Sequence, residues 1–298
     1  MFRKIFAVAC WIALAATSTG AAAQTVVTSA STLSAAGSYI LNSNVVTITI
    51  SGSNITVDLN GFGIRGSVVT TCSVTAGTAG NSCSGALSGT DALTITGNNV
   101  TIKNGQIFSG ANRGVVISSS ARQDVTLQNV KINSFKGDCI VSSSSGLTLD
   151  NVTVTACGGN GVLAQQDEAI FRNVVASNNN GSGIDALGSA IFENVHANWN
   201  KSIGIAADPG TAVRASVANN LSTGIGQMGV LKDSLSFGNG LYGVYAPFAS
   251  LVRDTYSRNN TSSDFNLSPD TCYFALVADS ASSIVSGVPL VGSTAACF

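Results

Sequence analysis

The sequence has little charge, and that scarcity excludes several classes of protein. Only 10% of its 298 residues are charged and the formal net charge is −1, whereas charged residues make up roughly a quarter of an average soluble domain. Without a basic face the chain has no electrostatic means of holding nucleic acid or an anionic membrane surface, so we expect neither partner. A hydrophobic content of 45% with only 4 prolines argues against a disordered chain.

Histidine and helical patterning are also scarce. His196 is the single histidine and no CxxC pair occurs, so the residue types that build a zinc site are missing. No window repeats apolar residues at the 3.6-residue period over three turns, which excludes a helical repeat. Phosphate-binding loops, HExxH and GxSxG are absent too. We therefore expect no metal site and no cofactor.

The first 23 residues predict a secretory signal peptide. Arg3 and Lys4 precede an apolar run over residues 5–16, and three alanines stand before Gln24 as a small-residue cleavage site. That run is too short to span a bilayer comfortably, and every later apolar run is interrupted. We therefore expect a secreted or periplasmic/extracellular chain without a membrane span. Loss of two of the 14 basic residues would leave 12 against 15 acidic ones, a net charge of −3.

Export changes what the cysteines imply. Six of the 7 cysteines follow residue 23, and an even number in an oxidising compartment predicts disulfides. Six cysteines allow fifteen pairings, but successive pairs fall in three separate regions of the chain. We predict the bonds Cys72–Cys83, Cys139–Cys157 and Cys272–Cys297.

A repeat of 21 or 22 residues dominates the sequence. Four segments alternate apolar and polar residues and carry asparagine at their fifth position: 125–132, 147–154, 169–176 and 190–197. The series of asparagines extends back by one residue and forward with serine and threonine: Asn104, Asn129, Asn151, Asn173, Asn194, Ser216, Ser234 and Thr255. A second column, about ten residues further on, is a glycine before a short apolar strand: Gly114, Gly161, Gly183, Gly204, Gly224 and Gly243.

Two short alternating strands per repeat predict an all-β solenoid. One coil cannot bury its apolar face alone, so coils must stack about 4.8 Å apart, each strand pairing with its equivalents above and below. We expect the repeated asparagines to turn inward at a bend, to hydrogen-bond one another along the axis, and to adopt the left-handed backbone.

At these residues the chain resembles the pectate-lyase-like superfamily of right-handed parallel β-helices, over roughly residues 38–265. Residues 55–66 are similar to the opening coil of secreted bacterial β-helix repeat proteins. The resemblance implies a single-stranded right-handed parallel β-helix with coils of 21–22 residues. We place the β-helix domain at residues 24–261, a disulfide-pinned loop at 67–90 and a C-terminal capping segment at 262–298. The superfamily includes lyases, hydrolases, epimerases and adhesins, so it implies no single activity.

One stretch is similar to a catalytic motif of polygalacturonases. Residues 137–141 (GDCIV) and 157–161 (CGGNG) are similar to the two parts of that motif, including both cysteines. The resemblance would make Asp138 a catalytic acid. Asp138 stands alone where that family has two adjacent acids, and Asn160 stands where it has histidine. Inverting hydrolases need two carboxyls about 6.5–9.5 Å apart, so we favour a β-helix corner with a structural disulfide.

A second candidate site lies just before the asparagine column. Gln128, Asp150, Arg172 and Glu193 share one register position, which places Asp150 and Glu193 about 9.6 Å apart along the axis. Resemblance to pectate lyases implies that Arg172 would abstract a proton and that the acids would hold Ca²⁺, although such calcium sites gather several carboxylates. The alternative, which we favour, is a ladder of cross-strand salt bridges.

Candidate substrate-binding residues lie nearby. His196 and Trp199 are predicted to point outward, and an exposed tryptophan is a platform for stacking sugars, although His196 can equally be a surface residue and Trp199 can fill a bend. Arg214, Lys232 and Arg253 recur at what we align as one register position. Such a cationic stripe would attract an acidic polysaccharide, unless Asp233 and Asp254 neutralise it.

Two functional hypotheses follow. The first, which we favour, is a non-catalytic secreted solenoid that binds or contacts extracellular or cell-surface polysaccharide. The second is a polysaccharide lyase or polygalacturonase-like hydrolase acting on acidic, pectin- or alginate-like glycans, with Ca²⁺ required only for a lyase.

Overall fold

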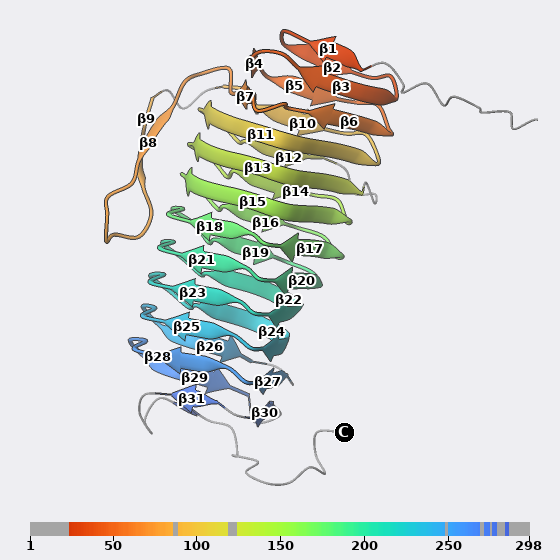
Figure 1. Cartoon of the computed structure of the whole chain (residues 1–298). Coiled ribbons are helices and arrows are strands. Elements are labelled where there is room, and N and C mark those ends of the chain that lie inside the picture. Colours follow the sequence, from red (N-terminus) through yellow and green to blue (C-terminus); the bar gives the residue numbers. More distant parts are fainter. Residues whose placement is uncertain are drawn as a thin grey trace, which may run out of the picture.

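The chain winds into a parallel β-helix, as the repeat predicts, and the helix is right-handed, as the resemblance to the pectate-lyase-like superfamily implies (Figure 1). The computed structural model describes residues 24–85, 89–118, 124–247, 250–268, 271–274, 276–278 and 284–285. The predicted signal peptide lies outside these residues. Within them the regular elements are strands, and no helix long and apolar enough to cross a membrane is found. Each turn passes through three parallel sheets, which we call sheets 1, 2 and 3.

Sheet 1 carries the alternating segments that first revealed the repeat. Its strands pair in parallel along the whole axis, with one register shift between the strands that contain Gly210 and Met228. They are β1 (Thr25–Val27), β3 (Gly37–Leu41), β6 (Ile55–Asp58), the first halves of β11 (Val100–Gly110), β13 (Val125–Phe135) and β15 (Leu147–Cys157), β17 (Ala169–Arg172), β20 (Ala190–Glu193), the second halves of β22 (Ile205–Val213) and β24 (Ile225–Lys232), β27 (Leu251–Arg253) and β30 (Cys272–Phe274).

Sheet 2 follows sheet 1 after a sharp bend in each coil. The bend lies inside the long strands β11, β13 and β15 and separates two strands in later coils. Sheet 2 consists of β4 (Val45–Val46), β7 (Gly63–Arg65), the second halves of those three strands, β18 (Val175–Ser177), β21 (His196–Asn198), β23 (Ser216–Ala218), β25 (Leu235–Phe237), β28 (Tyr256–Arg258) and β31 (Val277–Ala278).

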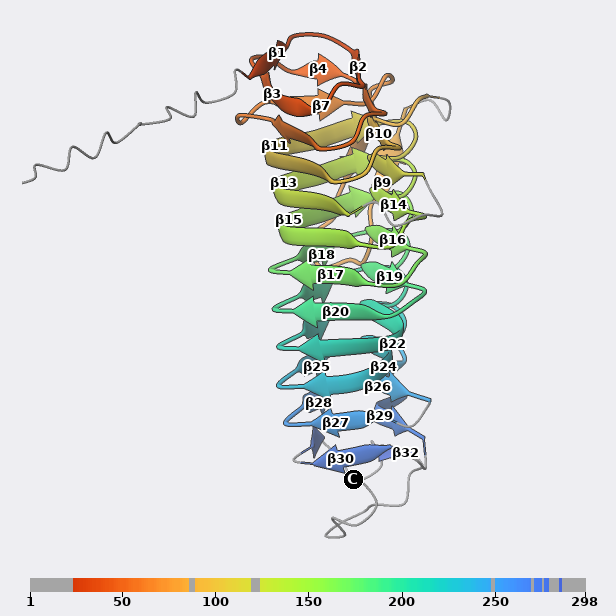
Figure 2. The same ribbon diagram turned by 90° about the vertical axis from the view of Figure 1, so that its right-hand side faces the viewer.

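Sheet 3 closes each turn and lies beside sheet 1 in Figure 2. Five of its strands directly follow one of the repeated glycines, as the sequence predicts, and a sixth contains Gly243. They are β2 (Ser31–Leu33), β5 (Ile48–Ile50), β10 (Leu93–Ile95), β12 (Val115–Ile117), β14 (Ile140–Ser142), β16 (Val162–Ala164), β19 (Ile184–Ala186), the first halves of β22 and β24, β26 (Tyr242–Ala246), β29 (Ser263–Leu267) and β32 (Ile284–Val285). Pairing therefore continues beyond residue 261, where we placed the start of the cap.

The core is a continuous column of inward side chains from all three sheets. Phe171 and Phe192, from equivalent positions of adjacent coils, stack with ring centroids 4.9 Å apart and are fully buried. Because parallel coils place identical register positions on top of one another, each large side chain packs against its counterpart one coil away.

The predicted asparagine ladder exists, but it faces solvent. Asn151 Nδ2 donates to Asn129 Oδ1 at 2.8 Å, and Asn194 Nδ2 donates to Asn173 Oδ1 at 2.9 Å. The predicted left-handed backbone is confirmed: φ lies between 52° and 61° at Asn104 and at these four residues. The inward orientation is wrong, because these side chains project from the bend between sheets 1 and 2 into solvent.

The forward extension of this ladder is also wrong. Strand pairing places Arg214, Asp233 and Asp254, rather than Ser216, Ser234 and Thr255, at the position of Asn194. These three residues carry the positive φ of that position, at 56°, 50° and 49°. Charged residues therefore continue the outer column that asparagine begins.

A second asparagine ladder, which sequence inspection missed, lies inside the solenoid at the bend between sheets 2 and 3. Its members are Asn179, Asn200, Asn220, Asn239 and Asn260. Asn200 Oδ1 accepts two bonds, from the backbone N of Asn179 at 3.1 Å and from its Nδ2 at 2.9 Å. The same pair of bonds recurs at each lower coil. The ladder thus satisfies backbone and side-chain groups that burial would otherwise leave unpaired.

The glycine column packs against this inner ladder. A Cβ on Gly183 would lie 2.8 Å from Asn200 Nδ2, and one on Gly204 would lie 2.8 Å from Asn220 Nδ2. Any side chain there would collide with a buried amide and with the next coil. At the five repeated glycines from Gly161 to Gly243, asparagine side chains occupy the space inside the bend and leave no room for a Cβ.

Two of the three predicted disulfides are confirmed. Cys72–Cys83 joins β8 (Thr71–Ser73) to β9 (Ser82–Ser84), an antiparallel hairpin in the predicted loop. Cys139–Cys157 links two neighbouring coils beneath the bend between sheets 2 and 3. Cys297 lies outside the described residues, so the bond Cys272–Cys297 stays a prediction.

The two ladders should differ sharply in their effect on stability. We expect Asn220→Ala to lower the free energy of unfolding by about 3 kcal/mol, because it strands buried donors and acceptors on two coils. Asn151→Gly, which keeps the left-handed backbone of the outer ladder, should lower it by under about 1 kcal/mol. Urea unfolding followed by circular dichroism measures both, and equal effects would contradict the assignment of the inner ladder.

Candidate functional site

The disulfide-pinned loop lies along the corner between sheets 2 and 3, beside several coils (Figure 1). At its start, Thr70 N donates to Ser109 Oγ at 3.1 Å, and Ser109 Oγ donates to Thr70 O at 2.9 Å. Next to its tip, Asn81 Nδ2 donates to Cys157 O at 2.7 Å and to Asn178 O at 2.8 Å. These bonds hold the loop in a defined position on the solenoid.

The tip of this loop forms one wall of a hollow, which we call the corner groove. Gly80 N donates to Trp199 O at 2.7 Å and so fixes the tip beside the tryptophan. The groove has a volume of about 530 Å³, and its lining residues are Gly77, Thr78, Ala79, Trp199, Asn219, Asn220, Leu221, Gly238, Gly240 and Thr261. That volume is within the range of small-molecule sites, about 300–1,000 Å³.

The groove follows from substitutions at one register position of the coil. One register position precedes the inner-ladder asparagine in each coil and has φ between 55° and 63°; its residues are Asn178, Trp199, Asn219, Gly238 and Asn259. Trp199 places an indole where the neighbouring coils have amides, and two coils further on Gly238 has no side chain. A large ring above a missing side chain leaves space between them.

A smaller hollow of about 170 Å³ adjoins the corner groove. Thr78 and Ala79 line both, and Lys201 is the charged side chain that lines the smaller one. Lys201 is exposed and lies against Gly80 of the loop. The two hollows together offer an aromatic surface, hydroxyl and amide groups, and one cation.

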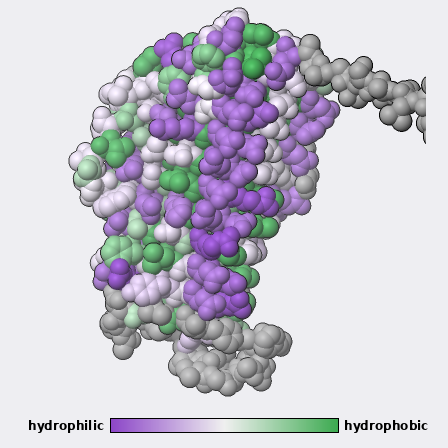
Figure 3. Space-filling model, viewed as in Figure 1, coloured by the Kyte–Doolittle hydropathy of each residue, from purple (hydrophilic) through white to green (hydrophobic). Residues whose placement is uncertain are grey.

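The predicted column before the outer ladder is confirmed. Gln128, Asp150, Arg172 and Glu193 are register partners on successive coils. With the outer ladder they form a hydrophilic band along the axis (Figure 3), which we call the charged edge. Gln128 Nε2 donates to Asp150 Oδ2 at 3.4 Å, and Arg172 Nε lies 3.6 Å from Glu193 Oε2. This geometry is the cross-strand ladder that we favoured.

The cations that were predicted to form a stripe belong to the same edge. Lys232 and Arg253 are direct register partners, whereas Arg214 lies one residue further along its coil, so their common register is wrong for Arg214. Arg214 pairs with Glu193 at 2.6 Å. Asp233 lies 3.4 Å from Lys232 and Asp254 lies 3.5 Å from Arg253. Acids therefore accompany each of the three cations.

Asp138 occupies a corner of sheet 3 and holds the next coil. Its Oδ1 accepts a hydrogen bond from Asn160 N at 2.5 Å, and Asn160 Oδ1 accepts one from Ser182 N at 2.8 Å. At the same register position, Arg113 lies one coil before Asp138 and binds both carboxylate oxygens of Asp91, which lies two coils before Asp138. Side chains at this position thus pair with backbone or with one another along the axis, and Asp138 is remote from the charged edge.

His196 lies on the outer face of sheet 2, between Val175 and Ser216 of the adjacent coils, and is half-buried. Further along the same face, Arg258 stacks over the rings of Phe237 and Tyr256, at 5.0 and 5.4 Å from their centroids. Sheet 2 therefore separates the charged edge from the corner groove. His196 and Trp199 lie on one coil, but Arg214, Lys232 and Arg253 do not line the groove.

One carboxyl on sheet 3 has an altered acidity. Burial raises the pKa of Asp185, which lies between Leu163 and Ala206 of the neighbouring coils. Asp167, at the bend before sheet 1, shows the opposite shift, because hydrogen bonds from Ser189 N and Ser189 Oγ lower its pKa. Neither residue lines the corner groove.

No group of three or more histidine, cysteine or acidic side chains is placed to hold a metal ion in the described part of the chain. Sequence reasoning identified Trp199 but missed Thr78, Asn219 and Thr261, which surround it. Asn219 could have been found from a pair of residues that recurs once per coil, because Asn178-Asn179, Trp199-Asn200 and Asn219-Asn220 occupy the same register position. The loop contact through Asn81 had no signal, because it joins residues about 100 positions apart.

Comparisons with known proteins concern the fold. A family model described as "Right handed beta helix region" matches residues 123–266, and no curated protein matches the chain. The enzymatically active domain of bacteriophage CBA120 tailspike protein 2 is 13% identical with a TM-score of 0.45, over 82% of this chain and 47% of that one. The A-module of an Azotobacter vinelandii mannuronan C-5 epimerase is 11% identical with a TM-score of 0.35, over 84% and 79%.

The receptor-binding domain of the siphovirus 9NA tailspike is 10% identical with a TM-score of 0.33, over 91% of this chain and 75% of that one. The chain thus spans about half the length of the CBA120 tailspike domain.

The altered acidities of Asp185 and Asp167 predict opposite pH effects. A raised folded-state pKa favours folding at pH below the unfolded value, and this contribution is lost as pH rises through the folded value. Asp185→Asn should therefore melt higher than wild type at pH 7, with the gap closing below about pH 4.

Asp167→Asn provides the control of opposite sign. It should melt lower than wild type at neutral pH, because a lowered pKa stabilises the fold above the unfolded value, and this gap too should close in acid. Thermal melts between pH 3 and 7 measure both, and a pH-independent difference for Asp185→Asn would contradict its burial as the cause.

Proposed function

Because residues 123–266 form a right-handed β-helix region, we propose that this protein is a non-catalytic, exported solenoid that binds extracellular or cell-surface polysaccharide in the corner groove. The observation that carries the proposal is the position of Trp199 in a groove of about 530 Å³ whose other polar side chains are neutral.

The chemistry of the groove suits a sugar. A pyranose ring has a face of C–H bonds, which packs on an indole, and a rim of hydroxyls, which exchange hydrogen bonds with neutral side chains. Thr78, Asn219 and Thr261 provide hydroxyl and amide groups around Trp199. Because the groove is open to solvent along a corner of the solenoid, a polymer can occupy it without threading an end.

Lys201 favours an acidic glycan. Its ammonium group is exposed in the hollow that shares Thr78 and Ala79 with the groove. A uronate carboxylate on a neighbouring sugar unit would meet that positive charge, and its attraction would weaken with added salt.

The location outside the cytoplasm is part of the proposal. Its support is the pair of disulfides, Cys72–Cys83 and Cys139–Cys157, since such bonds persist in oxidising compartments. The predicted signal peptide points the same way.

The positions of the candidate catalytic residues favour binding over catalysis. On the charged edge Arg172 pairs with Glu193, and Asp150 accepts hydrogen bonds from Gln128 and Asn173. Asp138 holds a backbone group of the next coil. None of these four lines the corner groove, so no acid–base pair faces a sugar bound beside Trp199.

Replacing the tryptophan tests the proposal. Trp199→Asn gives this position the residue that the neighbouring coils carry with the same left-handed backbone, so the fold should persist while the stacking surface is lost. We expect affinity for polygalacturonate or alginate, measured by affinity electrophoresis, to fall about tenfold. Asn259→Gly, at the same register but outside the groove, should bind like wild type.

Unchanged retention of Trp199→Asn would make the tryptophan a structural residue and refute the proposed site. The same preparations should release neither unsaturated sugars nor reducing ends from these polymers, with or without Ca²⁺. Product release that Arg172→Ala or Asp138→Asn abolishes would favour the lyase or hydrolase instead.

A further inference from the structure

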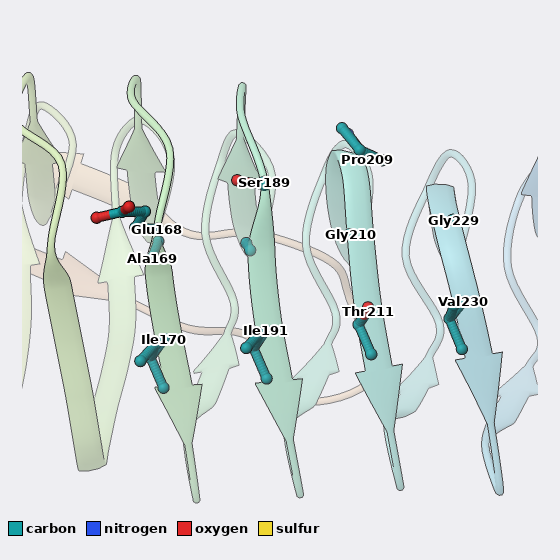
Figure 4. Close-up of a pocket in the computed structure, with 11 residues that line it drawn as sticks. Glu168, Ala169, Ile170, Ser189, Ile191, Pro209, Gly210, Thr211, Gly229 and Val230 are labelled. Atoms are coloured by element: carbon teal, nitrogen blue, oxygen red, sulfur yellow. The ribbon is translucent and has the colours of Figure 1, made fainter.

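A second groove, unrelated to the corner groove, runs along the outer face of sheet 1 (Figure 4). We call it the sheet 1 groove. It has a volume of about 520 Å³. Its floor is a row of side chains from β17, β20, β22 and β24, and its far wall is the bend before sheet 1. The floor residues are Ile170, Ile191, Thr211 and Val230.

This row departs from the pattern of the preceding coils. The same outward position is threonine on three successive coils, at Thr101, Thr126 and Thr148, and then becomes Ile170 and Ile191. Threonine suits an exposed strand because it combines β-propensity with a polar group. The change to isoleucine removes the hydroxyls where the groove begins, and Ile191 remains 49% exposed.

The shape of the row matches an extended hydrocarbon chain. Register partners repeat about 4.8 Å apart along the axis, so the four floor side chains form a straight strip of roughly 14 Å that is apolar except for the hydroxyl of Thr211. The strip is one side chain wide, with the bend residues Glu168, Ser189 and Pro209 on one side, so the carboxylate of Glu168 lies on the wall opposite the arginines. A narrow, straight, apolar channel fits a single alkyl chain better than a sugar ring, whose hydroxyls would find few partners there.

The opposite rim of the strip carries cations. Arg172 follows Ile170 by two residues and therefore projects from the same face of sheet 1. Arg172 and Arg214 both contact Glu193, at 3.6 and 2.6 Å, so two guanidinium groups share one carboxylate. Asp150, one coil away, accepts hydrogen bonds from the amides of Gln128 and Asn173. Two guanidinium groups beside one carboxylate leave a net positive charge at this rim, which attracts an anionic oxygen group.

We propose that the sheet 1 groove binds a single-chain amphiphile, with its alkyl chain on Ile170, Ile191, Thr211 and Val230 and its carboxylate or phosphate on Arg172 and Arg214. Guanidinium groups bind both kinds of anion through paired, charge-assisted hydrogen bonds. This site is separate from the corner groove, so its existence does not depend on the proposed glycan binding.

A chain-length series tests the apolar half of the site. Isothermal titration of the whole protein with octanoate, decanoate and dodecanoate, each below its micelle concentration, should show affinity rising about two- to fourfold per methylene. Ile191→Ser should weaken dodecanoate binding and flatten the series. Val26→Ser, an equally exposed aliphatic position of sheet 1 in β1 (53%), should match wild type.

The head-group half is tested separately. Arg214→Gln should weaken dodecanoate at least about fivefold while preserving the dependence on chain length, and dodecyl phosphate should follow dodecanoate. Dodecyltrimethylammonium should bind more weakly than either anion, because the rim is cationic.

Three results would overturn the proposal. These are affinity independent of chain length, equal binding by Ile191→Ser and wild type, and dodecyltrimethylammonium binding as tightly as dodecanoate. Analytical ultracentrifugation adds a fourth: a dimer that Ile191→Ser dissociates would assign the strip to a second copy of the chain. Loss of dodecanoate binding in Trp199→Asn would also contradict two separate sites.

Discussion

The inner asparagine ladder is the interaction on which the rest of this solenoid depends. Each turn must reverse direction between sheets 2 and 3, and the backbone groups at that bend face the interior, where water cannot satisfy them. Asn200 and Asn220 meet this demand by bonding the backbone and the amide of the coil beside them. The same amides exclude a side chain at Gly183 and Gly204. The inner ladder and the glycine column therefore have one cause, the limited space inside the bend.

The outer surface has more freedom, and the chain uses it differently on each face. The bend between sheets 1 and 2 lies in solvent, so amides, acids and arginines can all occupy it provided that they tolerate the left-handed backbone. That tolerance lets the outer ladder change from Asn194 to Arg214 and Asp233 without a change of path. Sheet 1 changes from threonine to isoleucine at Ile170, and the corner changes from asparagine to tryptophan at Trp199. Each such change leaves the core untouched and alters one local surface.

Sequence periodicity predicted the architecture well because stacking makes one coil predict the next. The period, the strands after the glycines, the left-handed asparagines and the column from Gln128 to Glu193 all follow from residues that recur at fixed intervals. It assigned the wrong asparagines to the interior because the inner and outer asparagine columns recur with the same period. The two differ in side-chain direction, which depends on the sense of the bend. The register error at Arg214 arose from the shorter coils in that part of the chain, where equivalent residues are 19 or 20 positions apart.

Sequence periodicity could not predict the two grooves, because they depend on residues and a loop that occur in single coils and do not recur. The disulfide-pinned loop runs beside the coils that follow it, and Asn81 reaches Asn178 only because a fixed number of turns separates them. The loop therefore requires a fixed number of coils between its attachment at Ser109 and its attachment at Asn178. Deleting or duplicating one whole turn between these two attachments would preserve the pairing of strands but would separate Asn81 from Cys157 and Asn178. The same change beyond Thr261 would leave these loop contacts intact. A stacked protein changes its length most easily by gaining or losing whole turns. In this molecule the C-terminal coils can change in this way, whereas the coils beside the loop cannot.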